Sequence, residues 1–218
     1  MKILVAAATP IEISPFLKQI RENPFLFPNT DVLITGIGLT AATFSLSKQF
    51  QICKPELVIQ AGVGGCFDIS KPLGTVVAVK QETIADQSVI EINQLKTLFD
   101  LKLVPHNQFP YNKGWLINKN EVIKKVKLPK VKGISVNEIT TSKQKKKFYE
   151  NHFAPVVESM EGAALHYTCL MENIPFIQIR AMSNYIAERN KKKWNMKESI
   201  HNLNTELDKL LNTLNTTM

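Results

Sequence analysis

The chain has 218 residues and a net charge of +8, and it is 44% apolar with 9 Gly and 11 Pro. This length and composition fit one globular α/β domain, or at most two small ones, with enough apolar residues for a full core. No apolar run approaches the roughly 20 residues of a membrane helix, so we expect no membrane partner.

Strand-like and helix-like stretches alternate along the first part of the chain. Residues 3–8 form a continuous apolar run, typical of a strand covered on both faces. The run stops at Pro10 and Glu12, which favours a buried strand over a signal peptide. The pattern then predicts a helix over 12–21, a strand over 32–35, a helix over 39–50, and strands over 57–61 and 75–85.

The periodicity fades between 86 and 130, where we expect an irregular excursion with a loop that could cover a site. It returns with a strand over 131–136, a basic helix near 143–150, a short strand at 156–157, a helix over 160–172 and a strand over 175–180. A last helix, about 197–214, carries its apolar residues on one face. With no repeat or linker, the sequence predicts a single α/β domain over 1–218, with a mostly parallel or mixed central sheet flanked by helices.

The cysteines, histidines and basic clusters further limit the functions that the chain could have. Three scattered cysteines indicate reduced thiols in a cytoplasm, and neither they nor the four histidines have metal-ligand spacing. We therefore expect no metal. Lysines cluster at 124–132, 143–147 and 191–193, where nucleic acid or an acidic membrane could bind. No aromatic residues alternate with these lysines, so solvated surfaces are the better interpretation. The positive electrostatic field of the clusters would also suit an anionic small substrate.

Two glycine-rich segments follow predicted strands. Gly36 and Gly38 resemble the start of a dinucleotide loop, but the acidic residue expected after the next strand is missing, so a tight turn is favoured. Gly62, Gly64 and Gly65 follow the strand 57–61, at an edge where ligands bind in open α/β sheets. A turn explains these glycines as well as a ligand loop does.

Polar residues also follow predicted strands. Glu161 falls in the first turn of a helix, where capping alone would explain it, and Glu158 lies close before it. Glu12 follows the first strand and could serve the helix dipole or act as a general acid or base. Ser183 and Asn184 end the last strand, where Asn is common for its turn geometry. Because parallel strands put such ends on one side, we expect these groups to lie together.

In order and spacing, the segments TGIG at 35–38, QAGVGG at 60–65, ESMEGAA at 158–164 and IRAMSN at 179–184 resemble the nucleoside phosphorylase and nucleosidase superfamily. The branch is similar to bacterial methylthioadenosine and adenosylhomocysteine nucleosidases, and within it ESMEGAA followed by IRAMSNYIAERNKKKW most resembles the futalosine hydrolases. The resemblance implies an N-glycosidase without metal or organic cofactor. It also implies a homodimer, in which a neighbour completes the far end of the pocket.

The resemblance also implies roles for individual residues. Glu12 would activate the attacking water, and Glu161 would bind the ribose hydroxyls with Met160 packed on the sugar. The backbone at Gly62 and Val63 would line sugar and base. A further stretch would border the purine, with an Ile where adenine-cleaving relatives often have Phe; its candidate residues are Val136, Ile139 and Thr140.

Asn184 stands where adenosine-cleaving relatives carry an Asp. An Asn side chain offers both an NH₂ donor and a carbonyl acceptor, so it can donate to a 6-oxo group and accept from a protonated N7. An unmet buried polar group costs about 1–3 kcal/mol, which would favour hypoxanthine over adenine. Arg189, or a lysine at 191–193, would pair with the carboxylate of the substrate tail, and Trp194 or Tyr185 would contact its ring.

Alternatives to futalosine hydrolysis remain open at this point. Phosphorolysis is less favoured, because the segment around residues 9–12 offers no Arg for phosphate. A nucleosidase that releases adenine from methylthioadenosine, adenosylhomocysteine or aminofutalosine is the main alternative. A nucleoside-binding protein without catalysis would keep the pocket, and a nucleic-acid binder would need salt-sensitive binding.

Overall fold

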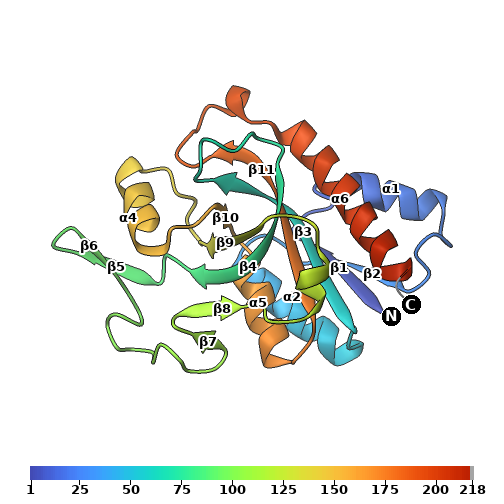
Figure 1. Ribbon diagram of the computed structural model, residues 1–218, viewed down its shortest axis with the longest axis horizontal. Coiled ribbons are helices and arrows are strands. Elements are labelled where there is room, and N and C mark those ends of the chain that lie inside the picture. The colour runs from blue at the N-terminus through green and yellow to red at the C-terminus, as the bar shows by residue number, and fades with distance from the viewer. Residues whose placement is uncertain (217–218) are drawn as a thin grey trace.

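The computed structural model describes residues 1–216, with side chains described through residue 214. Nine strands form one mixed sheet, and two more form a separate hairpin (Figure 1). The strands of the sheet are β1 (Ile3–Ala7), β2 (Thr30–Ile34), β3 (Leu57–Cys66), β4 (Val76–Ile84), β7 (Tyr111–Asn112), β8 (Trp115–Ile117), β9 (Lys130–Ser135), β10 (Val157–Ser159) and β11 (Phe176–Tyr185); the hairpin is β5 (Ser88–Glu91) and β6 (Gln94–Thr97).

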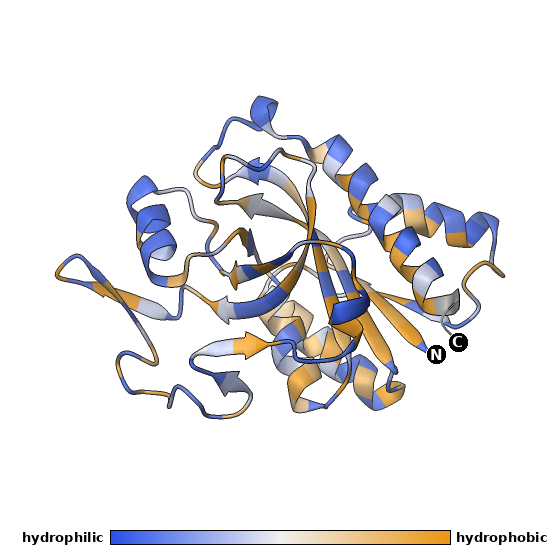
Figure 2. Cartoon of the chain, in the orientation of Figure 1, coloured by the Kyte–Doolittle hydropathy of each residue, from blue (hydrophilic) through white to orange (hydrophobic). Residues whose placement is uncertain are grey.

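Helices cover both faces of the sheet. They are α1 (Ser14–Glu22), α2 (Leu39–Ile52), α3 (Val122–Lys125), α4 (Lys143–Phe153), α5 (Gly162–Met171) and α6 (Met196–Thr216). In β1 the side chains alternate: Ile3 and Val5 join the apolar cluster under α1 and α6, and Leu4 joins the cluster under α2 and α5. Figure 2 shows the resulting apolar strands at the centre, and helices whose polar residues face outward.

The sheet is mixed, within the predicted α/β class. Strands β2, β1, β3 and β11 run parallel to their neighbours in that order, as do β10, β9 and β4. The two groups meet through antiparallel pairs, β3 with β10 and β4 with β11. Strands β3, β10, β9, β4 and β11 therefore pair in a closed circuit, and the ends of β1, β3 and β11 lie at one edge.

Two strands are longer than the sequence predicts. The segment from Gly62 to Cys66 was expected after the end of a strand, but it continues β3 and pairs with β11. Likewise β11 runs past Arg180 to Tyr185, with a register shift between Met182 and Asn184. Glycines and polar residues interrupt the apolar pattern here while the backbone pairing continues, so the pattern alone placed the strand ends too early.

Other boundaries shift by a few residues. Helix α1 begins at Ser14 rather than at 12, and α5 begins at Gly162, so Glu161 is the N-cap residue and not part of the first turn. The predicted irregular excursion over 86–130 contains the β5–β6 hairpin, β7, β8 and α3, and none of its residues lines the main cavity described below. Within the described chain, no helix is long and apolar enough to cross a membrane.

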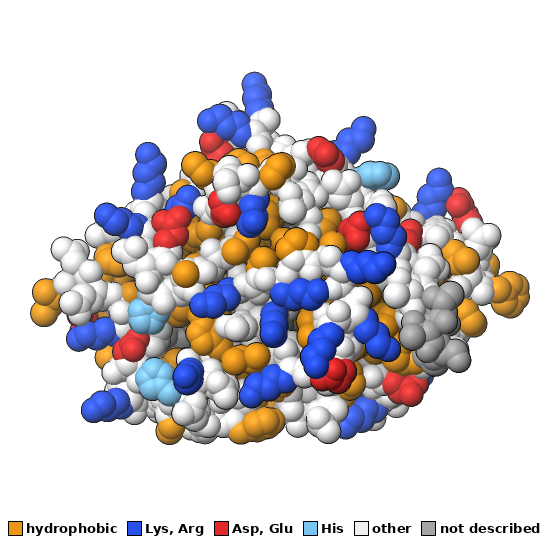
Figure 3. All heavy atoms as spheres, in the orientation of Figure 1, with side chains coloured by type: hydrophobic (Ala, Val, Ile, Leu, Met, Phe, Trp, Pro, Cys, Tyr) orange, Lys and Arg blue, Asp and Glu red, His pale blue; other side chains and the backbone are white. Residues whose placement is uncertain are grey.

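The predicted basic clusters lie on the surface beside acidic residues. Lys145 pairs with Glu138, Lys146 with Glu150, and Lys193 with Glu188. On the face shown in Figure 3, Lys and Arg side chains are interspersed with acidic and apolar ones. These contacts fit the interpretation of the clusters as solvated faces.

Candidate active site

A cavity of about 390 Å³ opens at the edge where β1, β3 and β11 end. Most of the candidate residues line it, from segments far apart in the sequence. They are Glu12, Val63, Ile139, Thr140, Met160, Glu161, Asn184 and Arg189. The parallel strands β1, β3 and β11 bring Glu12, Val63 and Asn184 to one edge, as the strand-end argument requires. By contrast, Met160 and Glu161 reach it through β10, which pairs antiparallel with β3.

Two candidates, Gly62 and Val136, do not line the cavity. Val136 follows the end of β9 and is buried in an apolar cluster with Tyr149 and Phe153, so its side chain turns away from the expected purine site. Gly62 lies beneath the cavity. A Cβ at this position would overlap Nη1 of Arg180 and lie 3.0 Å from Oε1 of Glu12. The glycine therefore makes room for the charged groups below the site rather than for the ligand.

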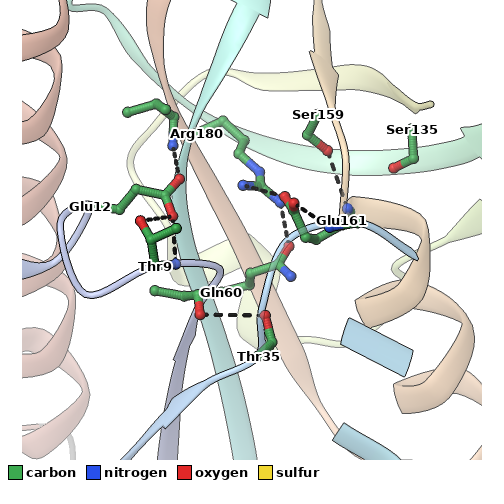
Figure 4. A network of polar contacts seen from close by, with 12 residues as sticks. Thr9, Glu12, Thr35, Gln60, Ser135, Ser159, Glu161 and Arg180 are labelled. Atoms are coloured by element: carbon green, nitrogen blue, oxygen red, sulfur yellow. Dashed lines mark hydrogen bonds and ion pairs between the residues drawn. The ribbon is translucent and has the colours of Figure 1, made fainter. Parts of the chain in front are cut away.

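Glu12 lies in the turn between β1 and α1 and is 9% exposed. Its Oε1 accepts a hydrogen bond from the backbone N–H of Val63 at 3.0 Å. Its Oε2 accepts from the Thr9 N–H at 3.0 Å and from Thr9 Oγ1 at 3.1 Å (Figure 4). These three donors fix the carboxylate at the cavity wall.

The last helix holds the backbone of this same turn. Asn204 on α6 is buried, and its Nδ2 donates to the carbonyl oxygen of Glu12 at 2.9 Å. Its Oδ1 accepts from the N–H of Phe16 in α1 at 3.2 Å. One side chain therefore holds the Glu12 turn and the start of α1 together, from a position 188 residues after Phe16. No local sequence pattern signals this contact, because it depends on how α6 packs.

Glu161 does not cap its helix through its side chain, although it is the N-cap residue of α5. Its Oε1 accepts from the N–H of Gly38 at 3.0 Å, and its Oε2 lies 3.7 Å from Nη1 of Arg180. The first N–H groups of α5 are bonded instead by serines: Gly162 donates to Ser159 and Ala163 to Ser135. The capping alternative is therefore wrong, and the carboxylate faces the cavity.

Arg180 is a buried cation beside Glu161. It is 1% exposed, and its Nη2 donates to Oε1 of Gln60 at 2.7 Å. Figure 4 shows its guanidinium between Glu12 and Glu161. A buried Arg needs an anionic partner, and Glu161 supplies one. The sequence analysis assigned Arg180 no role; a charged residue within a predicted buried strand is the signal that could have found it.

A further buried acid, Glu82, lies behind this group. It is fully buried beside Gly133 and Gly162, and its Oε1 accepts from Ser135 Oγ at 3.3 Å. Burial raises the pKa of Glu82 to about 8, against an opposing effect of the Arg180 charge and of hydrogen bonds. The carboxyl group of Glu82 is therefore protonated at neutral pH.

We expect Glu82 to make stability fall as the pH rises. The folded protein keeps a proton that the unfolded chain releases above its ordinary pKa of 4.5, so stability is highest below that value and is lost as the pH rises to about 8. The loss should be about 1.4 kcal/mol per pH unit, or about 2 kcal/mol between pH 5.5 and 7. Urea unfolding at several pH values measures it. Glu82→Gln, which stays neutral, should remove this slope; parallel curves for the two proteins would contradict the assignment.

Asn184 lies on β11 with its side chain on the cavity wall. Ser183 Oγ donates to its Oδ1 at 2.9 Å, and its Nδ2 donates to the carbonyl oxygen of Tyr185 at 3.2 Å. The carbonyl oxygen of Tyr185 can only accept, so this bond sets the orientation of the amide. One of the two Nδ2 hydrogens stays available for a ligand.

The outer end of the cavity carries one cation and one aromatic ring. The Arg189 guanidinium lies 5.6 Å from the ring centre of Trp194, and both residues line the cavity. The lysines at 191–193 do not line it, and Tyr185 donates its hydroxyl to the carbonyl of Lys71 instead. Of the alternatives for the substrate tail, Arg189 and Trp194 are therefore the pair in position. Among the described residues, no group of three His, Cys, Asp or Glu side chains could hold a metal.

The family follows from the sequence as a whole. The profile of the phosphorylase superfamily matches residues 5–216. The chain belongs to the phosphorylase superfamily. Its relatives include the futalosine hydrolase of Thermus thermophilus, 26% identical over 182 residues, covering 82% of this chain and 80% of that one. They also include a 5′-methylthioadenosine/S-adenosylhomocysteine nucleosidase of Staphylococcus aureus, 24% identical over 166 residues, covering 73% of this chain and 71% of that one.

A solved structure of this superfamily shows the same fold. The 5′-methylthioadenosine/S-adenosylhomocysteine nucleosidase of Helicobacter pylori superimposes with a TM-score of 0.79, covering 98% of both chains at 18% identity. The predicted single α/β domain with a mixed sheet is therefore confirmed. The two named activities of the sequence relatives lie at nearly equal identity, so the choice between their substrates depends on the residues of this cavity.

Proposed function

We propose that this protein, a nucleoside N-glycosidase of the phosphorylase superfamily, hydrolyses futalosine to hypoxanthine and dehypoxanthinyl futalosine. One observation carries the choice of base: the cavity that contains Glu12 and Glu161 is lined by an amide, Asn184, and not by an acid at this position. The futalosine hydrolase of Thermus thermophilus among the relatives supports the same substrate.

In the proposed reaction Glu12 accepts a proton from water as the water oxygen attacks the anomeric carbon. The bond from that carbon to the purine nitrogen breaks, and its electron pair moves into the base. Asn184 stabilises the developing charge by donating its remaining N–H to the oxygen of the base, and solvent supplies the proton that the departing purine takes. Glu161 accepts hydrogen bonds from the ribose hydroxyls, and Met160 packs against the sugar.

Hydrolysis is favoured over phosphorolysis by the charges of the wall. Arg189 is the one Lys or Arg among the described residues that line the cavity, and it lies at the outer end with Trp194. Next to Glu12 the donors are the Thr9 and Val63 groups, which are already bonded to its carboxylate. A phosphate nucleophile would need cationic or free N–H donors there.

We also expect a homodimer that closes the rim of the cavity. Ile11 and Ile37 line the cavity, yet they are 68% and 62% exposed. Large apolar side chains exposed beside a site are typical of an interaction surface.

The substrate assay tests the proposal directly. The protein is incubated with futalosine, aminofutalosine and methylthioadenosine, and the released base is identified by chromatography. Hypoxanthine from futalosine, at a higher kcat/KM than adenine from either other substrate, is the expected result. Adenine as the preferred product would instead establish the nucleosidase named in the Staphylococcus aureus relative.

Replacing the amide should change the preference for the base. Asn184→Asp is expected to shift the ratio of kcat/KM for aminofutalosine over futalosine upward by about 10–100-fold, because a carboxylate leaves the 6-oxo group without a donor. Asn190→Asp is a matched control, since Asn190 caps the short turn at Lys191–Lys193 and does not line the cavity. An unaltered ratio in the Asn184 variant would refute the role of this residue.

A further inference from the structure

Glu158 is a buried acid of the cavity wall that the reaction above does not use. It is 5% exposed and lies on β10. Its Oε1 accepts from the backbone N–H of Thr140 at 3.1 Å, but its Oε2 has no hydrogen-bond partner among the described residues. The hydroxyl of Thr140, 1% exposed, lines the same cavity; it makes no well-formed hydrogen bond, although it lies close enough to the Glu158 carboxylate to lower its pKa. Buried polar atoms without partners are rare, and here they lie at a ligand site.

Strand register places Glu158 opposite Asn184. Both residues pair with Gly65 of β3, Glu158 from β10 on one side and Asn184 from β11 on the other. Since neighbouring strands lie about 4.8 Å apart, their Cα atoms are separated by roughly 10 Å. Directly paired residues point to the same face of a sheet. The central position is a glycine, and the side chain of Ile186 occupies the space where its Cβ would lie, so an apolar group forms the floor between the two.

From this arrangement we propose that Glu158 determines specificity for the base by accepting the N1–H of a 6-oxopurine on Oε2. The inference rests on the proposed function and extends it to the second edge of the base. A purine spanning the floor would present its O6 and N7 to Asn184 and its N1 to Glu158. Both groups then match hypoxanthine, whose N1 is a donor, and mismatch adenine, whose N1 is an acceptor.

The surroundings of Glu158 suit an acceptor that becomes fully bonded on binding. Burial raises its pKa; the Thr140 hydroxyl, the Thr140 N–H and the Lys145 charge act in the opposite direction, while Asp86 adds to the rise. An N1–H donor supplies the second hydrogen bond that the buried carboxylate lacks. Hydrogen bonds to charged groups are worth about 1.5–3 kcal/mol, equivalent to a discrimination of roughly 10–100-fold.

A structural role predicts something different. If Glu158 only anchored the loop before Thr140, Glu158→Gln would keep that anchor, because a Gln Oε1 also accepts from the Thr140 N–H. Its Nε2 would then face the base as a donor. It would oppose the N1–H of hypoxanthine and suit the bare N1 of adenine.

Binding of the free bases by calorimetry tests this without turnover. We expect Glu158→Gln to weaken the binding of hypoxanthine by about 10–100-fold and to leave the affinity for adenine unchanged or higher. Glu138→Gln, an exposed acid bonded to Lys145, serves as the control and should change neither. An equal fold-change in affinity for both bases would overturn the inference and show that Glu158 only anchors the loop before Thr140.

A second measurement uses the unaltered protein, so it holds even if the variant does not fold. 1-Methylhypoxanthine lacks the N1–H and should bind at least about 10-fold more weakly than hypoxanthine; equal binding would overturn the inference. Failure of the proposed function is a separate outcome, because it would show as no hypoxanthine released from futalosine, whatever the binding ratios.

Discussion

Replacing Glu12 with Gln is expected to lower kcat for hypoxanthine release from futalosine by about 10²–10⁴-fold, the usual contribution of a general base. Gln has the same shape and can still accept from Val63 or from Thr9, so the turn keeps most of its bonds. It cannot take the proton of the attacking water. Steady-state release of the base, with substrate affinity from calorimetry, separates the lost chemistry from the retained binding.

The control for this substitution is an acid of the adjoining helix that is remote from the chemistry. Glu22→Gln, at the end of α1, loses only an exposed pair with Lys18 and should keep full turnover. The thermal stability of the Glu12 variant should stay close to that of the unaltered protein. Turnover by Glu12→Gln within about threefold of the unaltered rate would show that another group activates the water.

Glu161→Gln is expected to lower kcat/KM by about 10²–10³-fold, because two charged hydrogen bonds to the ribose hydroxyls weaken together. The same change leaves Arg180, which is 1% exposed, without its anionic partner at 3.7 Å. A substrate lacking the 2′-hydroxyl distinguishes the two effects. If Glu161 binds that hydroxyl, the loss caused by the deoxy substrate should be large in the unaltered protein and small in the variant.

Glu172→Gln, beyond the other end of α5, provides the comparison, since it loses only a surface pair with Lys54. It should leave both substrates unaffected. An equal loss on the deoxy substrate in Glu161→Gln and in the unaltered protein would mean that this carboxylate holds Arg180 and does not contact the sugar.

Local sequence pattern predicts the alternation of strands and helices well, because buried parallel strands are continuous apolar runs. It also predicts that Glu12, Glu161 and Asn184 face one cavity, but the shared edge of parallel strands explains only Glu12 and Asn184, because Glu161 follows the antiparallel strand β10. It fails where the pattern of side chains no longer reflects the conformation of the backbone. The glycines after Ala61 continue β3, although nothing in their spacing distinguishes a strand from a turn.

The remaining errors come from register and from distant partners. Val136 lies one residue past the end of β9, where the side chain turns into the cluster with Tyr149 instead of the cavity. Glu158 faces the site because β10 pairs antiparallel with β3, a pairing that no local signal specifies. The dimer and a cytoplasmic location stay predictions.

The bridge from Asn204 to the Glu12 turn makes the proposed general base depend on the docking of α6. If α6 detaches locally, the carbonyl of Glu12 and the N–H of Phe16 lose their shared partner, and the turn loosens while the sheet stays folded. Mild denaturant should therefore abolish turnover before the global unfolding transition begins.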